Sequence, residues 1–159
     1  MGAARYGHEY RPDQGPRAQA AVFGDPALRP VIPGLGEPLE EALDAAGINV
    51  AAVHAVAVSH LHWDHAGGLR HFAGRVPVHA QRAELDFAMA PGLEPEQYGM
   101  FRVDYDDPSI DWRIADGDVE IAPGVTAVLT AGHTPGHQSF IVDMAGGGGF
   151  ALTPRCGHG

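Results

Sequence analysis

Three histidines and one aspartate lie within six residues, directly after a short valine-rich run. The run, Val53–Ser59, is apolar and bounded by polar residues, which predicts a buried strand. Alternate side chains of an extended chain point to the same side, so the first two histidines should face the same way. A turn at Trp63 should then bring the aspartate and the third histidine round to them. In chain order the four side chains are His60, His62, Asp64 and His65.

This cluster predicts a metal site. A lone histidine is usually a surface residue or a satisfied core residue, but the full HxHxDH pattern is not expected from composition alone. Imidazole nitrogen and carboxylate oxygen suit Zn²⁺, Fe²⁺ or Mn²⁺. Four such ligands on one short segment can serve two adjacent ions, two ligands each, with further ligands from distant loops. Gly67 and Gly68 follow and keep side chains out of a crowded region.

The rest of the chain predicts a mixed α/β fold with more strand than helix. Apolar residues from Leu39 to Ala46 recur at helical spacing, Pro38 suits the first helical position, and Gly47 is a natural stop. The acidic segment 91–108 is expected to be a loop that could act as a lid or a substrate wall. The other expected elements are a short strand at Ala20–Phe23, helices at Gly67–Phe72 and Gln81–Ala90, and strands at Val76–Ala80, Ile110–Ile114, Val119–Ile121, Val125–Thr130, Ser139–Asp143 and Phe150–Leu152.

Charge and composition exclude several classes of partner. The 159 residues fit one domain, and the net charge is −10 with no lysine. This balance argues against nucleic acid and anionic membrane surfaces. No segment reaches the roughly 18 apolar residues of a membrane span, and Met1–Tyr10 lacks the apolar core of a secretory signal, so we expect a cytoplasmic protein. The one cysteine, Cys156, rules out an internal disulfide.

Two segments carry a family resemblance. Ser59–Gly68 (SHLHWDHAGG) looks like the first signature of the metallo-β-lactamase superfamily, and Thr130–Ser139 (TAGHTPGHQS) looks like the second. The resemblance implies part of an αββα sandwich. It also implies that His60, His62 and His133 hold one ion, that Asp64 and His65 hold a second, and that Asp64 is catalytic. We interpret His137 as a second-shell group that orients the loop bearing His133.

A finer resemblance is to N-acyl homoserine lactonases. It rests on Tyr105–Trp112, Asp116–Val125 and the tryptophan of the first signature. We place the family domain at residues 28–153, between an irregular segment 1–27 and an atypical tail 154–159. The resemblance implies a two-ion hydrolase that opens a small lactone or ester through a metal-bound hydroxide. Zinc is the first choice of metal, with Fe, Mn or Co as alternatives.

The sequence departs from the family pattern at both ends. Pro154-Arg155 stands where the pattern expects Gly-Asp, the later metal histidine and most of the second half of the sandwich are missing, and Ile32-Pro33-Gly34 lacks an expected aspartate. We hypothesise a truncated or frameshifted member, which resequencing of the locus would test. An uncovered sheet edge and apolar face would favour association into a homo-oligomer.

Two alternatives to a lactonase stay open: a glyoxalase II-like thioester hydrolase, and a non-catalytic remnant that binds one ion through His60, His62 and His133. Metal analysis with a lactone-opening assay separates them. We expect no metal role for the remaining histidines and solvated turn positions for three carboxylates. These residues are His8, His54, His71, His79 and His158, and Asp106, Asp107 and Asp111.

Overall fold

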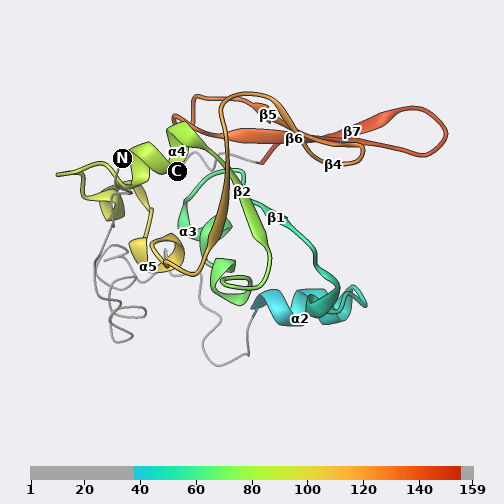
Figure 1. Ribbon diagram of the computed structural model, residues 1–159, viewed down its shortest axis with the longest axis horizontal. Coiled ribbons are helices and arrows are strands. Elements are labelled where there is room, and N and C mark those ends of the chain that lie inside the picture. Colours follow the sequence, from blue (N-terminus) through green and yellow to red (C-terminus); the bar gives the residue numbers. More distant parts are fainter. Residues whose placement is uncertain (1–37, 155–159) are drawn as a thin grey trace, which may run out of the picture.

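The computed structural model describes residues 38–154 and contains two β-sheets with short helices on one side (Figure 1). One sheet has three parallel strands in the order β1-β2-β3, and the other has four antiparallel strands in the order β4-β5-β6-β7. The predicted mixed α/β class is confirmed. The expected strand at Ala20–Phe23, the segment 1–27, His8, Cys156 and His158 lie outside the described residues.

The first strand of the parallel sheet leads directly into the histidine cluster. The sheet consists of β1 (Val56–Ala57), β2 (Pro77–Gln81) and β3 (Asp111–Ala115). The predicted strand Val53–Ser59 was too long at both ends, because β1 begins only at Val56 and ends at Ala57. The carbonyl groups of Val58 and Ser59 accept hydrogen bonds from the side chain and backbone of Gln138 instead of continuing the ladder to β2.

The antiparallel sheet is a meander of β4 (Val119–Ala122), β5 (Val125–Leu129), β6 (Gln138–Asp143) and β7 (Gly149–Leu152), as the turn signals predicted. The β6–β7 hairpin extends beyond the rest of the molecule (Figure 1). The loop between β5 and β6 turns back toward the parallel sheet, where the backbone N–H of Gln138 bonds Ser59. This contact brings the two family signatures together.

The helices are short. Two lie within a residue or two of their predicted positions: α2 (Pro38–Ala45) and α4 (Arg82–Ala88). The segment predicted as a loop at 91–108 instead contains η4 (Pro95–Tyr98) and α5 (Arg102–Tyr105). Its residues Met100, Phe101 and Tyr105 are fully or almost fully buried, so packing rather than periodicity orders this segment.

The core lies between the parallel sheet and these helices. It contains Val58, Leu61, Ala66, Leu69, Val78, Ala80, Leu85, Ala88, Met100, Tyr105 and Ile110. The antiparallel sheet contributes little to it and leaves large apolar side chains in solvent, including Phe150 and Leu152. Across residues 38–154, no helix has the length and apolar character needed to cross a membrane.

Candidate metal centre

The first histidines of the cluster lie on an extended segment directly after β1. His60 is 1% exposed and His62 is partly buried, and their ring centroids are 4.6 Å apart. Leu61 between them is fully buried in the core. The alternation predicted from the HxH spacing is therefore confirmed: the leucine anchors the segment while both imidazoles face the site.

The third histidine and the aspartate lie on a helical turn, α3 (Trp63–Ala66), rather than in a simple turn at Trp63. The ring of His65 lies 4.1 Å from that of His60, and its Nε2 is 3.5 Å from Asp64 Oδ2. The buried Ser59 hydroxyl lies 3.0 Å from His60 Nδ1 and 3.3 Å from His65 Nδ1. The Ser59 hydroxyl is thus within hydrogen-bond distance of two candidate ligand rings.

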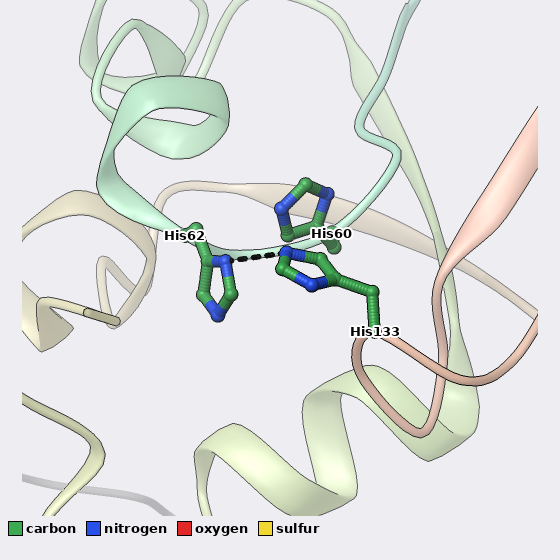
Figure 2. Close-up of side chains that lie close together, drawn as sticks. All are labelled: His60, His62 and His133. Carbon is green, nitrogen blue, oxygen red and sulfur yellow. Dashed lines mark hydrogen bonds between the residues drawn. The ribbon is translucent and has the colours of Figure 1, made fainter. Parts of the chain in front are cut away.

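His133 approaches from the loop between β5 and β6 (Figure 2). Its Nε2 lies 2.9 Å from His62 Nδ1, and its ring centroid is 4.7 Å from that of His60. The structure therefore brings a residue of the second signature into contact with residues more than seventy positions earlier in the chain.

Two groups of side chains present donor atoms that lie within 4.8 Å of one another: His60, His62 and His133, and His60, Asp64 and His65. All five predicted ligands occur in these groups, and His60 belongs to both. The resemblance instead implied Asp64 and His65 for the second ion, so the shared position of His60 was not anticipated.

The charge state of His60 and His62 suits binding of a cation. Burial, followed by the neighbouring imidazoles, lowers the pKa of His60 to about 3. Burial and His133 likewise lower the pKa of His62. Neutral imidazoles keep the nitrogen lone pairs that a metal ligand needs. The imidazole and carboxylate donors, together with the neutral state of His60 and His62, therefore fit one or two borderline divalent ions.

His137 lies behind the cluster, 3% exposed, with its ring centroid 5.2 Å from that of His60. Its Nδ1 is 2.8 Å from the Thr130 hydroxyl and 3.2 Å from the Thr130 carbonyl oxygen. Among residues 38–154, its buried Nε2 has no hydrogen-bond partner. These contacts join the two ends of the His133 loop, and the second-shell role of His137 stays a prediction.

Three of the histidines for which we expected no metal role are described by the structure and belong to neither donor group: His54, His71 and His79. The three carboxylates differ from one another. Asp107 accepts hydrogen bonds from the Ser109 backbone and hydroxyl, and Asp111 pairs with Arg113. Asp106, predicted to be solvated, is only 14% exposed and lies 4.0 Å from Arg102, one helical turn earlier, so that prediction was wrong.

Glu84 is a buried residue of the site region that the sequence did not single out. It lies in the first turn of α4, is 1% exposed, and accepts hydrogen bonds from both histidine-bearing segments. The sequence did contain a signal of this burial. At helical spacing Glu84 falls on the same face as Leu85 and Ala88, which are apolar and buried. A carboxylate on an apolar helix face requires buried partners.

Comparison with known proteins confirms the predicted resemblance. A family model described as the metallo-β-lactamase superfamily matches residues 25–153. An N-acyl homoserine lactonase from a Bacillus species is 40% identical over 95 residues, which cover 60% of this chain and 35% of that lactonase. The lactonase AttM of Azorhizobium caulinodans is 36% identical over 115 residues, covering 69% and 43%.

Solved structures give the same result. An AiiA variant from B. thuringiensis with N-decanoyl-L-homoserine at its active site aligns with a TM-score of 0.59 and 33% identity, over 70% of this chain and 41% of that one. An N-acyl homoserine lactone hydrolase with N-hexanoyl-L-homoserine at its catalytic metal centre aligns equally well, with 32% identity over 70% and 42%. The chain spans less than half the length of these relatives. The length and position of the family match show that the chain belongs to the metallo-β-lactamase superfamily.

Proposed function

We propose that this chain forms the metal-binding part of a hydrolase that opens the ring of N-acyl homoserine lactones or a similar small lactone. The observation that carries the proposal is the convergence of His60, His62, Asp64, His65 and His133 on one site. We propose that they hold two divalent ions, with zinc as the first choice. The lactone substrates of the relatives make the same class of reaction the best candidate here.

Bound ions would supply Lewis acidity and a water molecule that loses its proton near neutral pH. The protein would contribute position and charge. His60 is buried and neutral, so it offers a fixed lone pair at low cost in desolvation. The Asp64 carboxylate is 54% exposed, which leaves it accessible to a substrate. We propose that Asp64 Oδ2 takes up the proton of the attacking water and returns it to the alkoxide oxygen that is released when the lactone ring opens.

The segment after α4 supports an apolar substrate. Backbone N–H of Trp63 donates to the carbonyl oxygen of Gly99, so residues 95–101 lie beside the metal-binding turn. Tyr98 is exposed and its ring packs edge-on against Phe87. Aromatic side chains at this position could line the path of an acyl chain, and the net charge of −10 disfavours anionic substrates.

Metal analysis together with a lactone-opening assay tests the proposal. We expect about two ions per chain after zinc loading, and ring opening that disappears on removal of metal by a chelator and returns with zinc. One ion without turnover would support the non-catalytic alternative. A chain that retains no zinc would contradict the metal site itself.

A further inference from the structure

Glu84 connects the two segments that carry the candidate ligands. One carboxylate oxygen, Oε1, accepts a hydrogen bond of 2.9 Å from the backbone N–H of Leu61, between His60 and His62. The other, Oε2, accepts from the Thr134 hydroxyl at 2.5 Å and from the Gly136 N–H at 3.0 Å, just after His133. One side chain therefore spans both halves of the site.

The surroundings of Glu84 require this arrangement. Its side chain is 1% exposed, and among the described residues it forms no ion pair with an arginine or a histidine. A buried carboxylate is costly unless hydrogen bonds compensate it, and donors to an ionised oxygen form strong bonds. The three donors, two of them backbone groups, supply that compensation only while both ligand segments stay in place.

Gly136 lets the loop approach α4 closely enough for these bonds. A Cβ atom at this position would lie 2.1 Å from the Glu84 backbone nitrogen and 2.5 Å from the Glu84 Cβ. Both neighbours belong to the helix rather than to the flexible end of a side chain. The close approach of the His133 loop to α4 therefore depends on two residues: the Glu84 side chain, which accepts the hydrogen bonds, and Gly136, which has no side chain.

We propose that Glu84 is a positioning residue, which holds the His60–His62 segment and the His133 loop at the separation needed to share one metal ion. The inference rests on the proposed function, because it assumes that His60, His62 and His133 bind the same ion. A carboxylate suits the position because both oxygens must accept. The amide of Glu84→Gln keeps the shape but offers a donor to one of the two segments.

Gln81 provides a matched control. It precedes Glu84 by one helical turn and is equally buried, and it also joins distant segments through its side chain. Its amide bonds Gly117 and the side chain of Gln138, which directly follows the His133 loop, but it donates to and accepts from none of residues 60–62 and 133–136. Gln81→Met should therefore lower the free energy of unfolding and disturb the histidines less than Glu84→Gln does, because Gln138 keeps its own hydrogen bonds to Val58 and Ser59.

The test is the zinc affinity of the whole chain, measured by competition with a chromophoric chelator, alongside urea unfolding of the metal-free protein. We expect Glu84→Gln to weaken zinc binding by about 10- to 100-fold and Gln81→Met by less than about threefold. Wild-type affinity in Glu84→Gln, or equal weakening in both variants, would overturn the inference.

A second pair of variants decides the matter if Glu84→Gln does not fold. Thr134→Val removes one donor to Glu84 at nearly constant shape, whereas Thr134→Ser keeps the hydroxyl. Weaker zinc binding in the valine variant with wild-type binding in the serine variant supports the inference, and equal affinities overturn it. Absence of zinc binding in the wild type would instead overturn the proposed function, and this inference with it.

Discussion

His60 is the one candidate ligand, among the described residues, that belongs to both donor groups, because its ring nitrogens lie near His62 and His133 and also near Asp64 and His65. At 1% exposure it is also the most buried of the five candidate ligands, and its Nδ1 lies 3.0 Å from the Ser59 hydroxyl. If two ions bind, removal of the His60 side chain should weaken the binding of both. Removal of a ligand that belongs to only one group should weaken the binding of one.

We therefore predict that His60→Ala and His65→Ala differ in metal content. His60→Ala should lose both ions, and His65→Ala should retain about one. Zinc per chain, measured by elemental analysis after desalting, gives the result. The exposed His54, changed to alanine, is the control and should keep the wild-type content. Equal loss in His60→Ala and His65→Ala would contradict the central position of His60.

Asp104 carries a carboxyl group whose burial disfavours the ionised form. Burial raises its pKa to about 6, from an ordinary value of 3.8, while Arg70 acts in the opposite direction. The folded state then binds a proton more tightly than the unfolded state. The stabilising contribution of this proton is complete below about pH 3.8 and is lost as pH rises through about 6.

Asp104→Asn should consequently stabilise the protein at pH 7, by about 1 kcal/mol after allowance for solvent screening. The gain should shrink toward zero near pH 4, where wild-type Asp104 is protonated in the folded state. Urea unfolding of both proteins at the two pH values checks this, since all other titratable groups are common to both proteins and cancel in the comparison. Asp86→Asn, on the exposed face of α4, controls for the loss of a charge. A gain of equal size at both pH values would refute the interpretation.

At the scale of elements, the sequence predicted those helices and strands that depend on residues close together in the chain, and missed features that depend on distant residues. The HxHxDH segment, α2 and the antiparallel meander depend on local spacing and turns, so the sequence predicted them. The early end of β1 depends on Gln138, about eighty residues away. Likewise Glu84 depends on donors 23, 50 and 52 residues distant. Helices η4 and α5 have four residues each, too few for a period to be recognised.

The loop between β5 and β6 should tolerate little change where it meets α4. Gly136→Ala would place a methyl group 2.1 Å from the Glu84 backbone nitrogen, so the loop must move outward. We expect a loss of about 2 kcal/mol in the free energy of unfolding and weaker zinc binding, because His133 moves with the loop. Ala131→Ser, exposed in the same loop, should change neither quantity. Wild-type stability in Gly136→Ala would show that the contact is not limiting.

At the scale of the molecule, the antiparallel sheet has one apolar face that is only partly covered. The register places Phe140 opposite Leu152 and Val142 opposite Phe150, so these four side chains share a face, which continues through Val125 and Ala127 of β5. Ala127 is fully buried, but Phe150 and Leu152 are 59% and 57% exposed. Within residues 38–154 the apolar face is thus buried at Ala127 and exposed at Phe150 and Leu152. The last two belong to the β6–β7 hairpin, which projects from the rest of the molecule (Figure 1).

An exposed apolar face of this kind should drive association of the purified chain. We predict that the average molecular mass measured by sedimentation increases with protein concentration in the micromolar range. The double variant Phe150→Ser with Leu152→Ser should shift the chain toward monomer, because it removes the two largest exposed side chains of the face. Ala151→Ser, on the opposite face of the same strand, should associate like the wild type. If the wild type sediments as a monomer at every concentration, or if the control variant dissociates equally, the face does not mediate association.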